Sequence, residues 1–172
     1  MTANENAPAR HPVIVGVAPG QPTHVVEQAA RFAAQFGTDL ICAHVNPGRY
    51  AVDEAIDGSV VSSSIDPDFV DNREEVFDAN LAASLAAVLA NAGISWRTLV
   101  LAGDVATALG HLAETVDAAM IVVGTHDASM SGGIQEFFNR SVATGLAHHQ
   151  HRPVVVIPTH SHGSDAPKLG KK

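Results

Sequence analysis

Apolar and polar positions follow one another in short blocks that predict strands and helices in turn. Apolar residues recurring every three or four positions, the spacing that gives a helix one apolar stripe, separate short apolar runs rich in β-branched residues. Such runs are typical of strands buried on both faces of a parallel sheet. The strands are expected at residues 13–17, 40–45, 95–101, 119–123 and 154–157.

Four helices are expected between these strands. They are predicted from Val25 to Phe36 with Gly37 as the stop, over about 71–92 with Phe77 on the apolar face, after an Asp104 cap, and over about 137–149. Strict alternation predicts an α/β fold, a single doubly wound domain with a five-stranded parallel sheet and helices on both faces. The ligand crevice of such a sheet lies outside the carboxyl ends of its strands.

The domain is expected to span residues 11–158. The polar segment 1–10 and the polar, lysine-ended tail 159–172 are expected to be flexible. Residues 46–68 are rich in Gly, Ser, Asp and Pro and show no sustained period. A connection of this length predicts either a functional lid or a disordered segment.

Composition narrows the class of protein. Apolar residues make up 46% of the 172 residues, which is enough for a core and excludes a wholly disordered chain. The net charge of −8 without a basic run argues against nucleic acid or an anionic membrane as a partner. No apolar run approaches the roughly 20 residues of a membrane span. The polar stretch before Pro12 has no hydrophobic region, so we expect no secretion signal there. We expect a cytoplasmic protein whose single cysteine, Cys42, is a buried thiol.

The candidate chemistry lies after the fourth strand. Small residues from Gly124 to Gly133 lead towards a helix and can bring backbone N–H groups close to an anion. Arg140 and Ser141 can offer a cation and a hydroxyl to the same phosphate. The alternative is a plain strand-to-helix connection, because neither the dinucleotide fingerprint nor the Walker pattern is present.

Two further groups of residues have side chains that occur in metal or catalytic sites. Five of the ten histidines fall between 148 and 162, but no cysteine or carboxylate cluster completes a tetrahedral set, so no metal site is expected. His126, Asp127 and Ser141 have the side chains of a hydrolase triad, but no nucleophile-elbow motif orders them. We therefore expect no catalytic residue. His44, near the end of the second strand, is expected to be a hydrogen-bonded histidine of the core or rim.

Several stretches resemble the universal stress protein family. They are HPVIVGV at 11–17, LICAHV at 40–45, AGDVATALGHLAETVDAAMIVVG at 102–124 and RSVATGLAHHQHRPVVVIP at 140–158. The last is the most distinctive, since in that family a Gly-Ser-Val segment, a short helix and a proline precede the final strand. The resemblance implies a Rossmann-like sheet ordered 3-2-1-4-5 that often dimerises through its last strand. We expect a homodimer through Val154–Ile157, since an apolar edge invites antiparallel pairing with a second copy.

The resemblance also implies a crevice that binds ATP in some members and not in others. Binders carry Gly, two residues, Gly, nine residues, Gly and then Ser or Thr. Gly124 and Ser141 fit, but Arg140 replaces the last glycine, and the middle position is Asp127 or Met130 depending on the direction of counting. Ala18 stands where binders place an aspartate. By resemblance, the crevice positions are Gly16, Val17, Ala18, Val45, Val123, Gly124, Asp127, Met130, Arg140, Ser141 and Val142.

These departures argue against ordinary ATP binding. The expected function is a stress-response or regulatory module that is not an enzyme and does not bind ATP in the usual way. One alternative is a nucleotide-binding switch that takes ATP or AMP with Mg²⁺ and hydrolyses ATP weakly or slowly. Another is a structural dimer that recruits an unknown protein partner through residues 46–68.

Restoring the pattern of the binders tests the first expectation. The combined change Ala18→Asp and Arg140→Gly is expected to raise ATP affinity roughly 10- to 150-fold, the equivalent of one charge-assisted hydrogen bond of about 1.5–3 kcal/mol. Isothermal titration of both proteins with Mg-ATP measures the change. Equal affinities would mean that these positions do not decide nucleotide binding.

Overall fold

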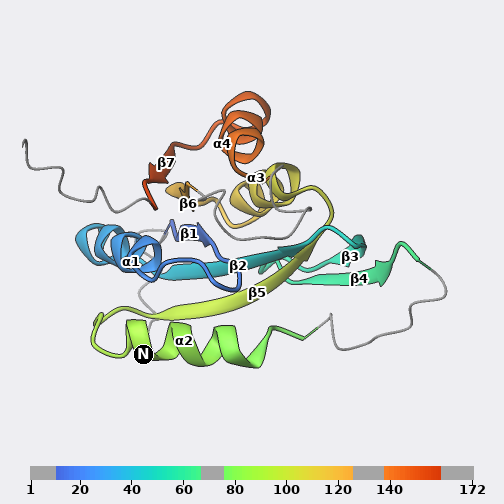
Figure 1. Ribbon diagram of the computed structural model, residues 1–172. Helices are drawn as coiled ribbons and strands as arrows, with labels where there is room; N and C mark the ends of the chain where they lie inside the picture. Colours follow the sequence, from blue (N-terminus) through green and yellow to red (C-terminus); the bar gives the residue numbers. More distant parts are fainter. Residues whose placement is uncertain (1–10, 67–75, 126–137, 160–172) are drawn as a thin grey trace, which may run out of the picture.

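A five-stranded parallel sheet forms the centre of the structure (Figure 1). The computed structural model describes residues 11–66, 76–125 and 138–159. The strands of the sheet are β1 (Val13–Gly16), β2 (Leu40–Asn46), β5 (Trp96–Ala102), β6 (Met120–Gly124) and β7 (Val154–Ile157). Their order is β5-β2-β1-β6-β7, so the order 3-2-1-4-5 implied by the resemblance is confirmed.

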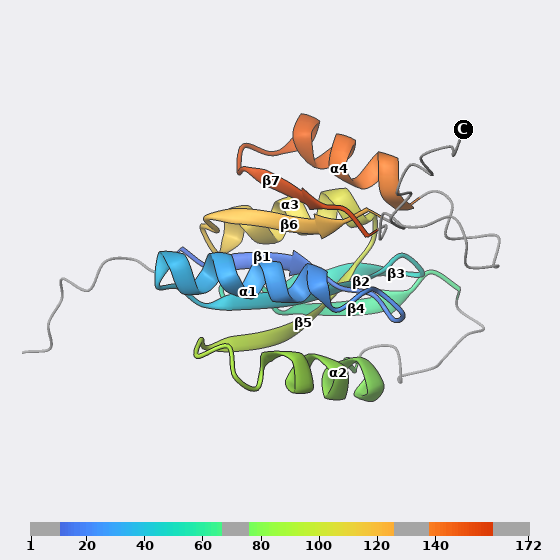
Figure 2. The same cartoon turned by 60° about the vertical axis from the view of Figure 1, so that its left-hand side comes forward.

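Helices cover both faces of this sheet, as predicted (Figure 2). The helices α1 (His24–Phe36) and α2 (Ala79–Leu89) pack on one face. The helices α3 (Val105–Thr115) and α4 (Phe138–His149) pack on the other. Among the described residues no helix is both long and apolar enough to cross a bilayer.

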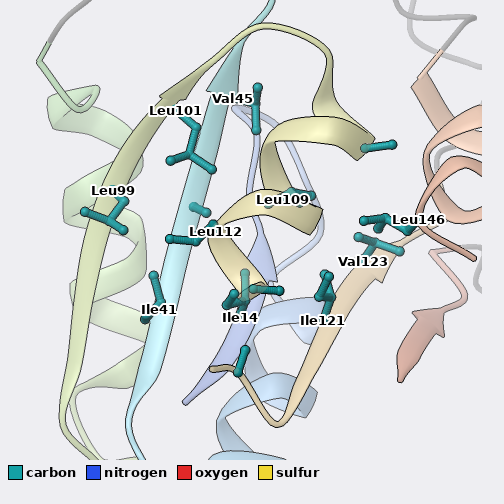
Figure 3. Packing of buried hydrophobic residues seen from close by; sticks show 14 of the residues in the cluster. Ile14, Ile41, Val45, Leu99, Leu101, Leu109, Leu112, Ile121, Val123 and Leu146 are labelled. Carbon is teal, nitrogen blue, oxygen red and sulfur yellow. The ribbon is translucent and has the colours of Figure 1, made fainter. Parts of the chain in front are cut away.

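Alternate side chains of each strand enter opposite cores. Ile14, Ile41 and Ile121 point towards α3, where they meet Leu109 and Leu112 (Figure 3). Their neighbours along the strands, Cys42 among them, face α1 and α2. Cys42 is fully buried as expected, and burial raises the pKa of its thiol to about 12. The thiol is therefore protonated at neutral pH and poorly reactive.

The second helix begins later than predicted. Asp78 is its N-cap, and the carboxylate of Asp78 accepts a hydrogen bond from the Leu81 N–H at 2.7 Å. Because this cap satisfies an N–H group of the first turn, the helix starts at Ala79. The expected placement of Phe77 on the helix was therefore wrong, and the predicted residues 71–75 lie outside the described ones. The predicted Asp104 cap is confirmed, with Thr107 N–H donating at 2.9 Å.

Residues 46–66 contain an antiparallel hairpin, so the expectation of a disordered segment was wrong for them. The hairpin consists of β3 (Arg49–Glu54) and β4 (Val60–Ser64). Val60 packs against the core on the α3 side of the sheet. The Glu54 carboxylate accepts from Thr115 at 2.9 Å and lies 2.5 Å from the ring of His111, both on α3. Contacts with α3 thus hold the hairpin against the domain.

The turn of the hairpin packs closely through Gly58. This residue is buried and has a φ of 82°, and a Cβ there would overlap Leu112 Cδ1. Leu112 is 1% exposed and has little room to move aside. Arg97, on β5 of the parallel sheet, donates to the Asp57 carbonyl at 2.6 Å. Only glycine therefore suits the position in both backbone conformation and packing.

A comparison of Gly58 with Gly93 separates the cost of backbone strain from the cost of overpacking. Gly93 has a φ of 65° but no atom within 4 Å of an added Cβ. Gly93→Ala is expected to cost about 1–2 kcal/mol from left-handed strain alone. Gly58→Ala is expected to cost about 1–3 kcal/mol more, because it also overpacks the contact with Leu112. Urea unfolding of both variants measures the difference, and equal losses of stability would show that the turn does not pack tightly.

Candidate functional site

A pocket of about 400 Å³ opens at the carboxyl ends of β1, β2 and β6. The chain runs outward from β1 through β2 to β5 and then returns to β6 on the other side of β1. The pocket therefore lies at the switch point of the sheet, where the sequence predicted a ligand crevice. Its volume is within the usual range for small-molecule sites.

Most of the predicted crevice positions come together there. The pocket wall includes Gly16, Val17, Ala18, Val45, Val123, Gly124 and Val142. Arg140 and Ser141 belong to α4, but nothing is described of their side chains. Asp127 and Met130, like His126, lie outside the described residues.

One wall of the pocket is the connection from β1 to α1, which hydrogen bonds tie to β2. Val17 N–H donates to the Ala43 carbonyl at 2.9 Å, and His44 Nδ1 lies 3.0 Å from the Val17 carbonyl. Since a carbonyl only accepts, His44 Nδ1 carries the proton, which leaves Nε2 as the acceptor in the neutral ring. Phe77 packs edge-on against this ring, with the centroids 6.4 Å apart. His44 is thus the hydrogen-bonded rim residue that the sequence predicted.

The close approach of three segments depends on Gly124. A Cβ at this position would lie 3.0–3.1 Å from side-chain atoms of Val25, Gln21 and Thr159. Gln21 in turn donates from its amide to the Gly16 carbonyl at 3.2 Å. The missing side chain of Gly124 thus lets the start of α1 and the end of the described chain approach β6.

Thr159 was predicted to begin the flexible tail, yet it forms part of the pocket wall. Its N–H donates to the Thr125 hydroxyl at 2.8 Å, and its own hydroxyl donates to the Thr125 carbonyl. Gln21, Asn46 and Thr125 also line the pocket and were not among the predicted crevice positions. Asn46 directly follows a predicted strand, and Thr125 lies in the small-residue segment from Gly124 to Gly133; these positions were the available signals. Nothing comparable marked Thr159, whose place depends on how β7 lies beside β6.

The described pocket wall is neutral. It contains no Lys, Arg, Asp or Glu, and its polar side chains are those of His44, Gln21, Asn46, Thr125 and Thr159. Across the described part of the chain, no group of three His, Cys, Asp or Glu is arranged to hold a metal ion. Apolar walls with a few amide and hydroxyl groups suit an uncharged ring system and its hydroxyl substituents.

The fold and the pocket together define a doubly wound α/β protein with a small-ligand crevice at its switch point. The sequence profile of the Universal stress protein family matches residues 9–158, and the chain belongs to that family. No curated protein sequence gives a significant match.

Solved structures share the fold at low sequence identity. A universal stress protein from Archaeoglobus fulgidus in complex with dAMP is 18% identical, with a TM-score of 0.59, covering 87% of this chain and 98% of its own. A family member from Burkholderia pseudomallei is 23% identical, with a TM-score of 0.58 and coverages of 88% and 98%. A universal stress protein in complex with cAMP is 19% identical, with a TM-score of 0.55 and coverages of 88% and 99%.

Proposed function

We propose that this member of the universal stress protein family is a stress-response regulatory module whose pocket binds a mononucleotide, and that it acts by binding rather than by catalysis. The observation that carries the proposal is the neutral pocket of about 400 Å³ at the switch point. Related structures described as complexes with dAMP and cAMP support this ligand class. The base and ribose would occupy the apolar wall, and a single phosphate would stay near the open rim.

The same neutrality argues against a tightly held Mg-ATP. A triphosphate carries several negative charges, and desolvating them is costly without paired cations. The described wall offers no cation and no carboxylate for a metal. It also lacks a paired nucleophile and base, since the only titratable side chain in it is that of His44. The alternative of an ATP switch requires a cation from outside the described wall.

Thermal unfolding with single ligands tests the proposal. AMP or cAMP at 100 times its dissociation constant is expected to add about 2.7 kcal/mol to stability, which raises the midpoint by roughly 5–10 °C. Mg-ATP at the same concentration is expected to stabilise less. A larger shift with Mg-ATP would instead support the nucleotide switch, and no shift with any of the three would exclude a nucleotide pocket.

A matched pair of variants locates the effect. Ala18 is exposed on the pocket rim, and Ala34 is exposed on α1 away from the pocket. Ala18→Trp is expected to abolish the shift by filling the entrance, while Ala34→Trp is expected to keep it. Retention of the full shift in Ala18→Trp would place the ligand elsewhere.

We further propose that the chain forms a homodimer through β7. This strand ends the sheet, and no described strand pairs with its outer side. The Pro153 and Ile157 carbonyls accept from Ile121 and Thr125 at 2.9 and 2.8 Å. Because successive residues of a strand alternate in direction, Val156 presents its N–H and carbonyl to the open edge. Its side chain is 42% exposed.

Proline at this position tests the pairing without disturbing the bonds to β6. Val156→Pro removes an outward N–H, which an edge strand tolerates within one subunit but an intersubunit ladder does not. The variant is expected to sediment as a monomer, and Val156→Thr, which keeps the N–H, as a dimer. Monomeric wild-type protein, or an unchanged dimer in Val156→Pro, would contradict the proposal.

A further inference from the structure

The connection that follows β1 begins with a tight turn at the mouth of the pocket. The Gln21 N–H donates to the Ala18 carbonyl at 3.2 Å, and Gly20, between them, has a φ of 78°. Proline followed by glycine at the two central positions is typical of a type II turn, whose second central residue needs a positive φ. Pro22 restricts the backbone of the residue before it as well. The backbone of Gln21 is therefore held between this turn and α1.

The side chain of Gln21 lies where β1 and β6 end. Its Nε2 donates to the Gly16 carbonyl at 3.2 Å, and the same atom lies 3.1 Å from the point that a Cβ of Gly124 would occupy. Val45 and Val105 line the pocket from β2 and from the start of α3. The carboxamide of Gln21 and this apolar part of the wall therefore lie towards different strands of the sheet.

Hydrogen bonds within the protein already engage other polar side chains of the pocket wall. The hydroxyls of Thr125 and Thr159 bond to each other, to the Thr125 carbonyl and to the Thr159 N–H. Asn46 Oδ1 accepts from a backbone N–H at 2.8 Å. His44 Nδ1 donates to a backbone carbonyl at 3.0 Å, so the neutral ring keeps an acceptor for a ligand but no donor.

Gln21 keeps both a donor and an acceptor. Its bond to the Gly16 carbonyl uses one N–H of the amide, and the described part of the chain makes no other hydrogen bond to this side chain. Among the described residues, every buried polar side-chain atom has a partner, so the unpaired Oε1 of half-buried Gln21 is open to solvent. One N–H and the Oε1 of the same carboxamide are thus available together.

We propose that Gln21 binds the ribose hydroxyls of the mononucleotide, an inference that rests on the proposed function of the pocket. A hydroxyl both donates and accepts, so it can pair with a carboxamide that has an unused N–H and an unused oxygen. With its base against Val45 and Val105, the ligand would place its sugar towards the ends of β1 and β6, where Gln21 lies. The pocket then prefers ribonucleotides, because a sugar without hydroxyls would cover the carboxamide and leave it unpaired.

Calorimetric titration with AMP and 2′,3′-dideoxy-AMP tests this pairing. The two ligands share base and phosphate and differ only in the two hydroxyls. Wild-type protein is expected to bind AMP roughly tenfold more tightly than dideoxy-AMP. Gln21→Met keeps the length of the side chain but has neither hydrogen-bonding group. It is expected to bind AMP roughly tenfold more weakly than wild type and dideoxy-AMP about equally well, so the preference disappears.

A matched control makes the same chemical change outside the pocket. Gln35 is exposed on α1 and is not part of the pocket wall, so Gln35→Met is expected to keep the wild-type preference for AMP. Thermal unfolding checks that both variants are folded. The affinity of Gln21→Met for dideoxy-AMP also checks that the pocket keeps its shape without the bond to Gly16.

Four results would overturn the proposal, and three of them leave the mononucleotide pocket standing. Equal affinities of wild-type protein for the two ligands would mean that the hydroxyls are not bound. A preference for AMP that survives in Gln21→Met would assign them to another residue. Equal weakening of both ligands by Gln21→Met would show that Gln21 shapes the wall or contacts the base or phosphate. If neither ligand binds wild-type protein, the proposed function fails together with the role of Gln21.

Discussion

The structure depends on covering both faces of one parallel sheet. Its strands are apolar on each side, so any uncovered area would expose core residues to water. The helices α1 and α2 cover one face. On the other face, α3 contacts β5, β2, β1 and β6, and α4 contacts β7. The hairpin contributes Val60 and the Gly58 turn beside Leu99 of β5. The hairpin therefore contributes to the core, although it lies in the connection between β2 and α2.

The pocket follows from the same arrangement. The strand order reverses between β1 and β6, so the helices α1 and α4 that follow these two strands lie on opposite faces and leave a space at the strand ends. The walls of this space come from residues that the strands hold in register, with Val17 bonded to Ala43 and Thr125 bonded to Ile157. Hydrogen bonds of the sheet therefore hold the inner wall of the site in place. Segments that follow the strands supply polar side chains to the pocket, those of Gln21, Thr125 and Thr159.

The strands and the position of the pocket were predictable because burial on both faces leaves a continuous apolar run in the sequence. The hairpin was not, because each of its strands has one side facing α3 and one facing water, and buried polar contacts replace part of the apolar pattern. Arg49 and Glu54 look like solvated residues in the sequence, yet one is buried and the other is bonded to α3. Thr159 belongs to the pocket through pairing with Thr125, a contact between segments that no local pattern encodes.

The helix α3 is shared between two surfaces of the molecule. Val105 and Leu109 near its start line the pocket, and His111 and Thr115 towards its end hold Glu54 of the hairpin. If a ligand in the pocket strengthens or weakens the attachment of the hairpin through this helix, linkage requires the converse: loss of the contacts between Glu54 and α3 then changes the affinity of the pocket by the same factor.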